Sequence, residues 1–472
     1  MTLPVGFRLR ADERTRCDDE GRLLVGGSPR RVLRLTDNGA ATARRLLNGE
    51  PVADARDAAL ARRLLDTGIA HPVPVDSEIT VDVVVPVYDD TARLERCLVS
   101  LGTGSPVTVV DDGSPDAREV VDVAAAHNAR LIRRPENGGP ASARNAGAAQ
   151  CTADVIAFVD SDALVDAATL RGAAAHFSDP LVAAVAPRIR ATGDGHGVLG
   201  VIARHWSPLD LGPVAGPVRP AARISYVPST VLLVRREAFV GVGGFGESLR
   251  YGEDVDLVWR LVAAGGRGLY EPALLAGHNE PTTWRRWLRR RFLYGTSAAT
   301  LARLHRDSAA PLVVQPAPAA VVGLAVAGAP AFGTLVAAIT ALRLRRRLRA
   351  AAVPSTDATR SAALAPAQAA LGAARWAGQL WWPALLLLAR RSRRARRASA
   401  AALLAPPLVE WAKRRPPLDP LRWTLALWAD DTAYGLGVWW GCLRDGTVRP
   451  LVPRVRFPRR DTPTSSDGNA TA

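Results

Sequence analysis

Cysteine is scarce in this sequence of 472 residues, and the cysteines are not paired. Four occur, at positions 17, 97, 151 and 442, and no two of them form a CxxC motif. This pattern indicates neither a zinc site nor a disulfide framework, and it fits a reducing cytoplasm. An apolar signal core is also missing near the N-terminus, because charged residues occur between Arg8 and Glu13. We therefore expect the folded part of the chain to face the cytoplasm.

Lysine is almost absent. Lys413 is the only one, so the formal net charge of +16 comes almost entirely from arginine. A strongly basic chain can bind nucleic acid, but the densest basic runs, Arg343–Arg349 and Arg390–Arg397, lie beside apolar stretches. Arginines in that setting face anionic lipid headgroups or mark the cytoplasmic side of a membrane. The charge pattern therefore favours membrane lipids as a partner and argues against nucleic acid.

Length and changes in composition divide the chain into four parts. A chain of 472 residues exceeds one ordinary domain of roughly 100–200 residues. Pro72 and Pro74 mark a linker, and a stretch without charged residues starts at Pro311. We therefore predict a small domain at 1–76, a catalytic domain at 77–305, a helical membrane-associated region at 306–458 and a disordered tail at 459–472.

The first part has the pattern of a small mixed domain. Short apolar strands at 23–25 and 32–35 precede two amphipathic helices. Thr36 or Asp37 can cap the first helix, and glycines can end both. This layout resembles the small winged-helix-like peptide-recognition domains of pathways that modify ribosomally made peptides. The alternative is a scaffold or lid domain.

Strands and helices alternate from Ile79 onward. Apolar, β-branched runs lie at 81–85 and 107–110, an apolar run lies at 154–159, and a short strand is expected at 130–132. Such runs are typical of strands buried on both faces of a parallel sheet. The sequence therefore predicts a doubly wound α/β domain, whose ligands bind beyond the carboxyl ends of the strands.

Two aspartates follow the strand at 154–159. Asp160 and Asp162 have i, i+2 spacing, so both carboxylates can reach one Mg²⁺ or Mn²⁺ ion that is shared with a substrate diphosphate. His278 is a candidate third ligand, although a lone histidine is more often structural. The position of the pair at a strand end favours the metal interpretation.

Two further segments are suited to a nucleotide. Asp111 and Asp112 end the strand at 107–110, where a carboxylate can accept hydrogen bonds from a uracil imide and from ribose hydroxyls. The segment 137–147 places two glycines before a helix, whose N-terminus favours phosphate, and Arg144 in this segment can face the base or the diphosphate. The alternatives are a simple strand-ending turn and a surface arginine.

A fourth segment, 252–260, places Glu253 and Asp254 at the start of a helix. The helix dipole favours negative charge there, so capping accounts for one carboxylate. The other can remove the proton of an attacking hydroxyl as general base, an effect of about 10²–10⁴ in rate. Two adjacent acids support more than capping, because one can be the base and the other can orient the acceptor.

Together these motifs look like family-2 glycosyltransferases with the GT-A fold. The resemblance rests on the ordered segments 85–88 (Val-Pro-Val-Tyr), 111–114, 143–147, 160–162 and 253–254. It implies a nucleotide-sugar donor, inversion by single displacement, and Mg²⁺ or Mn²⁺. By position it implies that the nucleotide sugar is bound by Pro86, Tyr88, Asp111 or Asp112, Arg144 and Asp160. It also implies that Asp254 is the general base, which leaves Glu253 to orient the acceptor.

The segment 283–287, Thr-Trp-Arg-Arg-Trp, is similar to the QxxRW motif of processive β-glycan synthases. There the arginine binds the diphosphate and the tryptophan stacks beneath the acceptor sugar, which implies these roles for Arg286 and Trp287. Arginine suits multidentate phosphate contacts. Thr283 replaces the glutamine, which leaves processivity open. A basic amphipathic helix on a membrane surface is the alternative.

The C-terminal part contains apolar stretches interrupted by proline and charge. The stretch 311–342 has no charged residue and exceeds the roughly 20 residues that span a bilayer, but its prolines favour a kinked or interrupted helix. A second crossing at 361–389 would have to include Arg375. The stretch 421–443 contains two aspartates, which favours an interfacial or packed helix. We expect a cell-membrane location with the catalytic domain facing the cytoplasm.

The order of the folded parts resembles that of the glycosyltransferases of mycofactocin biosynthesis. This resemblance implies transfer of glucose from UDP-glucose onto premycofactocin, a peptide-derived redox cofactor precursor, to build a β-1,4-linked oligoglucose chain. Two alternatives stay open. One is an envelope glycosyltransferase of the rhamnosyl- or mannosyltransferase type with a lipid or polysaccharide acceptor, and the other is a non-catalytic protein that binds nucleotide sugars.

Overall fold

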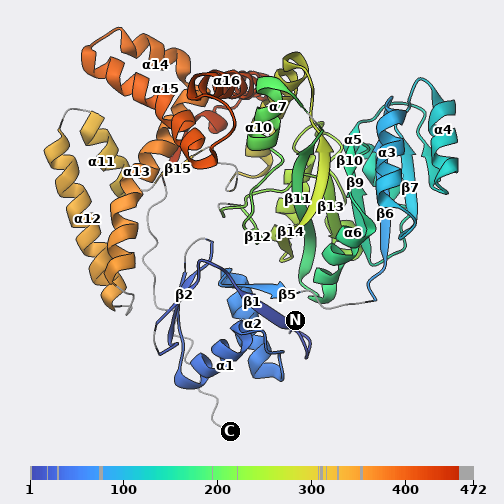
Figure 1. The fold of residues 1–472 in the computed structure, drawn as a ribbon, viewed down its shortest axis with the longest axis horizontal. Helices are drawn as coiled ribbons and strands as arrows, with labels where there is room; N and C mark the ends of the chain where they lie inside the picture. Colours follow the sequence, from blue (N-terminus) through green and yellow to red (C-terminus); the bar gives the residue numbers. More distant parts are fainter. Residues whose placement is uncertain are drawn as a thin grey trace. The chain divides into compact units, whose positions relative to one another are not determined.

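Figure 1 shows the computed structural model, which describes residues 3–18, 20–28, 31–73, 78–193, 195–220, 222–306, 308, 312–314, 316–326, 329–350 and 355–455. The chain divides into two compact units. The first comprises residues 1–309, 351–353 and 407–450, and the second comprises 310–350, 354–406 and 451–472. The tail predicted at 459–472 lies outside the described residues.

The N-terminal part of the first unit contains two helices and two small sheets. Helix α1 (Asp37–Leu47) begins after Thr36, whose hydroxyl caps it, and α2 (Ala55–Thr67) ends at Gly68 in the left-handed conformation. The predicted caps Thr36 and Gly68 are therefore confirmed, whereas the C-cap of α1 is Asn48, which precedes Gly49. Pairing between the two ends of this part was not predicted. In the first small sheet, β1 (Arg8–Ala11) pairs with β5 (Ala70–Val73). The second small sheet consists of β2 (Arg16–Cys17), β3 (Leu23–Gly26) and β4 (Arg31–Arg34).

A mixed nine-stranded sheet forms the centre of the first unit. Its strands are β6 (Val81–Val87), β7 (Val107–Asp111), β8 (Arg130–Arg133), β9 (Val155–Val159), β10 (Ala163–Leu164), β11 (Val182–Thr192), β12 (Gly216–Val218), β13 (Val231–Arg235) and β14 (Arg267–Asn279). Their order is β10-β14-β11-β13-β9-β6-β7-β8, and β12 pairs with β14. The strands β9, β6, β7 and β8 are parallel, whereas β13 runs antiparallel to β9 and β11. The four strands predicted from the sequence form this parallel group, and β11 and β14, which were not predicted, are also parallel to each other.

Helices cover both faces of this sheet (Figure 1). Alternate residues of β6 belong to two separate cores, with Val83 and Val85 on one face and Val84 on the other. Two cores explain why the strands are apolar on both faces, and the predicted doubly wound α/β arrangement is confirmed. The first face is covered by α3 (Thr91–Leu101), α4 (Ala117–Ala126) and α6 (Ala167–Ala174), and the second by α5 (Pro140–Ala148), α8 (Arg236–Gly241) and α9 (Glu253–Ala263).

Two long helices complete the first unit. A Cβ atom on Gly295 of α10 (Trp284–Leu304), or on Gly437 or Gly441 of α16 (Pro420–Asp445), would collide with backbone oxygen atoms of the other helix. Glycine lacks that atom, so the two backbones can approach closely. The stretch 421–443 is thus a packed helix, one of the two interpretations predicted for it, and it belongs to the first unit.

The second unit is mainly helical. The apolar stretch 311–342 is divided between two helices, as its prolines predicted. Among the described residues, no helix is both long enough and apolar enough to cross a membrane. The helices of this unit are α11 (Pro316–Val326), α12 (Pro330–Ala350), α13 (Ser355–Leu380), α14 (Trp382–Ala389) and the part of α15 (Arg393–Arg414) up to residue 406.

Candidate active site

The paired aspartates lie on the turn that leaves β9, near the middle of the sheet. The amide of Asp160 donates to the carbonyl oxygen of Thr230 at 3.0 Å, and the amide of Ala163 donates to that of Asp160 at 2.9 Å, which closes the turn. The side chains of Asp160 and Asp162 are 27% and 25% exposed. The turn therefore presents both carboxylates beyond the carboxyl end of β9.

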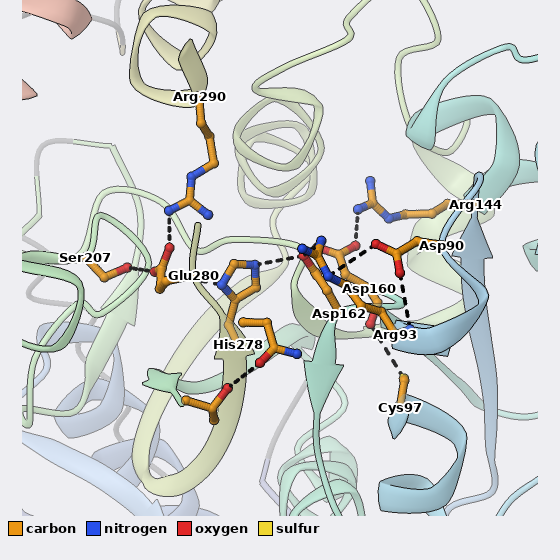
Figure 2. A network of polar contacts seen from close by, with 12 residues as sticks. Asp90, Arg93, Cys97, Arg144, Asp160, Asp162, Ser207, His278, Glu280 and Arg290 are labelled. Carbon is orange, nitrogen blue, oxygen red and sulfur yellow. Dashed lines mark hydrogen bonds and ion pairs between the residues drawn. The ribbon is translucent and has the colours of Figure 1, made fainter. Parts of the chain in front are cut away.

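Arg144 connects the two acidic motifs. Its side chain is 3% exposed; Nη2 donates to Asp160 Oδ1 at 2.6 Å, and Nη1 donates to Glu253 Oε1 at 2.9 Å. Figure 2 shows the guanidinium turned toward Asp160. Burial disfavours the charged form, but the two carboxylates outweigh burial and raise the pKa of Arg144. One buried cation thus brings the motifs at 160–162 and 253–254 to the same edge of the sheet.

Asp254 follows Glu253 in the first turn of α9, but its environment differs. Whereas Glu253 is ion-paired with Arg144, Asp254 accepts hydrogen bonds from the backbone amides of Ser229 at 3.2 Å and Val255 at 2.7 Å. Desolvation, with a further contribution from the charge of Glu253, raises the pKa of Asp254 to about 7. A carboxylate that titrates near neutrality is suited to general-base catalysis.

Asp111 holds the turn that follows β7. Its carboxylate is fully buried and accepts hydrogen bonds from the amide of Ser114 at 2.9 Å and from Arg133 Nη1 at 3.0 Å. Gly113 has φ of +78°, and a Cβ atom there would lie 2.9 Å from the amide nitrogen of Asn137. The turn therefore requires glycine, and the contacts of Asp111 agree with a turn-forming role.

Asp112 faces the glycine-rich segment before α5. It accepts hydrogen bonds from the amides of Gly138 at 3.1 Å and Gly139 at 2.7 Å, and it is ion-paired with Arg134. The start of a helix favours an anion, and here the protein's own carboxylate occupies that position. Neither Arg133 nor Arg134 was predicted as a site residue, although two adjacent arginines at the end of a strand were a visible signal. Nucleobase binding by Asp111 or Asp112 stays a prediction.

Pro86 and Tyr88 lie at the same edge of the sheet. Pro86 is inside β6, and Tyr88, which is 49% exposed, follows its last residue. The amide of Asp89 donates to Ser114 Oγ at 3.0 Å, which ties this segment to the turn after β7. Tyr88 is therefore accessible at the edge where Asp112 lies, and its predicted contact with a nucleotide remains open to test.

A chain of charged side chains extends from Asp162 toward α10 (Figure 2). His278 Nε2 lies 3.3 Å from Asp162 Oδ2, and His278 Nδ1 lies 3.8 Å from Glu280 Oε1. Glu280 accepts a hydrogen bond from Ser207 and is ion-paired with Arg290 of α10. Burial would lower the pKa of His278, but the two carboxylates outweigh burial and raise it to about 9. The structure therefore brings His278 beside Asp162, and Glu280, Ser207 and Arg290 are neighbours that were not predicted.

The segment 283–287 forms the beginning of α10, and its side chains have different surroundings. Thr283 is the N-cap, and its hydroxyl accepts a hydrogen bond from the amide of Arg286 at 3.4 Å. Arg286 is exposed, whereas Trp287 is fully buried and its indole N–H donates to Asp430 Oδ1 at 2.8 Å. A fully buried indole offers no face to a sugar, so the stacking inferred for Trp287 does not fit this arrangement. Arg290, one turn further on, is the arginine of α10 that reaches the charged chain.

The carboxylates at 160–162 fit a divalent cation. Their oxygen atoms are the hard ligands that Mg²⁺ and Mn²⁺ prefer, and both side chains keep exposed surface where substrate phosphates can complete the coordination. Within the part of the chain that the structure describes, no three His, Cys, Asp or Glu side chains are grouped so that they could hold a metal ion. A cation shared between Asp160, Asp162 and a substrate diphosphate is thus the arrangement that these residues suit.

Known proteins are similar to this chain over part of its length or over nearly all of it. Residues 82–239 match the family Glycosyl transferase family 2. The chain is 40% identical over 470 residues to the pre-mycofactocin glycosyltransferase of Mycobacterium tuberculosis, covering 96% of this chain and 99% of that protein. It is 33% identical over 235 residues to the N-acetylglucosaminyl-diphospho-decaprenol L-rhamnosyltransferase of the same species, covering 42% of this chain and 75% of that protein. The solved structure of mannosyltransferase PcManGT from Pyrobaculum calidifontis in complex with GDP-Man and Mn²⁺ is 20% identical, covers 78% of this chain and 89% of its own, and has a TM-score of 0.46.

Proposed function

Because the chain belongs to glycosyl transferase family 2, together with the pre-mycofactocin glycosyltransferases that it matches along nearly its whole length, we propose that it glycosylates premycofactocin. The observation that carries this acceptor is the 40% identity over 96% of the chain, which includes both parts outside the family-2 segment. The similarity to the rhamnosyltransferase covers only 42% of the chain. If the acceptor is derived from a peptide, the N-terminal part can recognise it. In this proposal, α1, α2 and the sheet β2-β3-β4 form a winged-helix-like peptide-recognition domain.

UDP-glucose is the donor in this proposal, and a β-1,4-linked oligoglucose chain is the product. A uracil imide donates a hydrogen bond, which suits a carboxylate such as Asp112, and the exposed Tyr88 lies at the same edge. The basic side chain of Arg134 accompanies Asp112 there. These residues are the reason for proposing a nucleotide whose base forms hydrogen bonds. The choice of glucose as the sugar comes from the family resemblance.

The chemistry proposed is a single displacement with inversion at the anomeric carbon. Asp254 takes the proton of the acceptor hydroxyl as that hydroxyl attacks, and the charge of Glu253 is neutralised by Arg144, so Asp254 is the acid available as base. Asp160 and Asp162, together with the diphosphate, would hold Mg²⁺ or Mn²⁺; His278, beside Asp162, stays a prediction as third ligand. When bound, such an ion neutralises the charge of the diphosphate leaving group. Arg144 keeps Asp160 oriented toward that position.

The test is a transfer assay with purified full-length protein, which receives premycofactocin or a lipid-linked acceptor in separate reactions. UDP-glucose, UDP-N-acetylglucosamine, GDP-mannose and dTDP-rhamnose are offered separately, and products are identified by mass spectrometry. We expect stepwise addition of hexose from UDP-glucose in the presence of Mg²⁺ or Mn²⁺. Transfer of rhamnose or mannose to a lipid-linked acceptor, with none to premycofactocin, would support the envelope alternative and overturn the proposal.

We also propose that the chain works at the cytoplasmic face of the cell membrane and binds it through α16. Leu421, Leu425, Leu436, Trp440 and Leu443 are each 51–75% exposed, and their spacing places them on one side of the helix. The other side packs against α10. Exposed arginines, Arg422 and Arg444, lie at the two ends. An apolar helix face flanked by arginine suits the surface of an anionic bilayer.

Vesicle flotation tests this location. Full-length protein is expected to float with vesicles that contain phosphatidylglycerol, and the double variant Leu436→Ser/Trp440→Ser is expected to stay in the soluble fraction because its apolar contact with the bilayer is lost. Val99→Ser, which changes an exposed apolar residue on α3, is the matched control and should float like the wild type. Flotation of the double variant to the wild-type extent would contradict the role of α16.

A further inference from the structure

Two tyrosines that the chemistry above does not use meet beside the first turn of α9. Tyr251 lies two residues before Glu253, and Tyr294 lies in α10. Their ring centroids are 6.3 Å apart and the ring planes are inclined at 63°, which is an edge-to-face contact. Gly252 packs against α10 itself, because a Cβ atom there would lie 3.1 Å from Ser297 Cβ. The two rings therefore lie next to the helix start that carries the proposed base.

Tyr294 is close to the charged groups of the site. The guanidinium carbon of Arg290 lies 5.9 Å from the centre of its ring. Burial raises the pKa of Tyr294, Arg290 opposes this rise, and the carboxylates of Glu280, Asp254 and Asp160 add to it. The interaction between charges weakens with distance, so these three carboxylates lie within electrostatic reach of the Tyr294 hydroxyl. The side chain of Tyr294 therefore belongs to the candidate active site.

The hydroxyls of the two tyrosines are available to a ligand. Among the described residues, neither the Tyr251 nor the Tyr294 hydroxyl has a hydrogen-bond partner, and neither is fully enclosed. By contrast, the hydroxyl of Tyr270 donates to the carbonyl oxygen of Gly212 at 2.8 Å. Both Tyr251 and Tyr294 are half-buried, and a buried tyrosine hydroxyl usually has a partner. A ligand that carries hydroxyl groups would supply it.

The proposed product indicates which ligand this is. If the product is an oligoglucose chain, the acceptor ends in glucose from the second transfer onward. A glucose ring has apolar C–H groups on its faces and hydroxyls around its rim. Tyrosine has an apolar ring and a polar tip, so one side chain can contact both parts of a sugar. Trp287 cannot do so, because its indole is fully buried and donates to Asp430.

We propose that Tyr251 and Tyr294 bind the terminal glucose of the growing acceptor and direct its attacking hydroxyl toward Asp254. Both are positioning residues that favour an acceptor ending in a sugar. This inference rests on the proposed function, because it requires a glucosylated acceptor. It also gives the two faces of α10 separate roles, since Trp287 anchors the helix to α16 and Tyr294 faces the site.

The test compares two acceptors, premycofactocin and its monoglucosylated product, in initial-rate assays with full-length protein and UDP-glucose. Tyr294→Phe keeps the ring and removes one hydrogen bond, so the KM for the monoglucosylated acceptor should rise about 5-fold. Tyr251→Leu keeps apolar volume but loses the ring, and a rise of about 5-fold is expected there too. The KM for premycofactocin should rise less. The Kd for UDP should stay at the wild-type value, which a general loss of structure would not allow.

Tyr434→Phe is the matched control. It removes a hydroxyl from another half-buried tyrosine, in α16, whose ring lies 5.0 Å from the guanidinium carbon of Arg291, and both KM values should stay unchanged. If Tyr294→Phe does not fold, Tyr251→Leu decides the test.

A wild-type KM for the monoglucosylated acceptor in the folded variants, or equal rises for both acceptors, overturns the role of the two tyrosines and leaves the proposed function intact. Absence of glucose transfer by the wild type to either acceptor overturns both.

Discussion

The variant Asp254→Asn is expected to lower kcat for sugar transfer by about 10²–10⁴-fold, the usual contribution of a general base. Asparagine cannot take the proton of the acceptor hydroxyl. Its one side-chain oxygen can keep one of the two hydrogen bonds that Asp254 accepts, from Ser229 at Oδ2 and Val255 at Oδ1, and neither bond involves a residue predicted to bind the nucleotide. The Kd for UDP should therefore stay close to that of the wild type. Initial rates and calorimetric titration with UDP measure the two quantities on the same preparation.

The pH profile provides the second half of this prediction. The pKa of Asp254 is raised to about 7, so its carboxylate is protonated and inactive as a base below that pH. In the wild type, kcat should rise with pH through about 7, and the residual rate of Asp254→Asn should lack this rise. Asp54→Asn, which changes the aspartate at the N-cap of α2, is the control and should transfer sugar like the wild type. Wild-type turnover by Asp254→Asn would exclude Asp254 as the base.

The variant Arg144→Ala is expected to lose both stability and transfer. It removes the cation that bridges Asp160 and Glu253 and leaves two carboxylates near each other without a counter-charge. Breaking a buried ion pair in this way costs about 3 kcal/mol in the free energy of unfolding, the low end of the usual range because Asp160 is partly exposed. Transfer should fall in parallel, because Asp160 is no longer oriented.

Arg144→Lys is the matched variant for this prediction. It keeps the positive charge, but one ammonium group does not reproduce the planar fork that contacts two carboxylates. Urea denaturation should place its stability between those of the wild type and Arg144→Ala, with transfer still reduced. If Arg144→Ala unfolds at the wild-type urea concentration and transfers sugar at the wild-type rate, Arg144 does not connect the two motifs.

The strands β6, β7, β8 and β9 could be predicted because they contain short apolar runs, and acidic residues mark the ends of β7 and β9. Such runs are recognisable without knowledge of their neighbours. The position of β13, which lies antiparallel between β9 and β11, could not be predicted from the sequence, because strand pairing depends on contacts between distant segments. The small β1–β5 sheet was missed for the same reason.

The candidate site could likewise be predicted only in part. Its acids were recognisable from motif and position, but the arginine that connects Asp160 to Glu253 acts over 109 residues, and no local pattern indicates such a contact. For Trp287, the motif predicted a role that its surroundings do not fit. Its motif implied a sugar-stacking residue, whereas its indole is buried against Asp430 of α16, 143 residues away. Which face of α10 is buried depends on α16, and the segment 283–287 alone could not reveal it.

In the proposed mechanism, the acids at one edge of the sheet hold a divalent cation together with a nucleotide diphosphate. Calorimetric titration of UDP into the wild type and into Asp162→Asn, each with Mn²⁺ and with EDTA, tests it most directly. Mn²⁺ should strengthen UDP binding to the wild type and have little effect on Asp162→Asn. Equal UDP affinity in Mn²⁺ and in EDTA for the wild type, or a wild-type response to Mn²⁺ in Asp162→Asn, would contradict it.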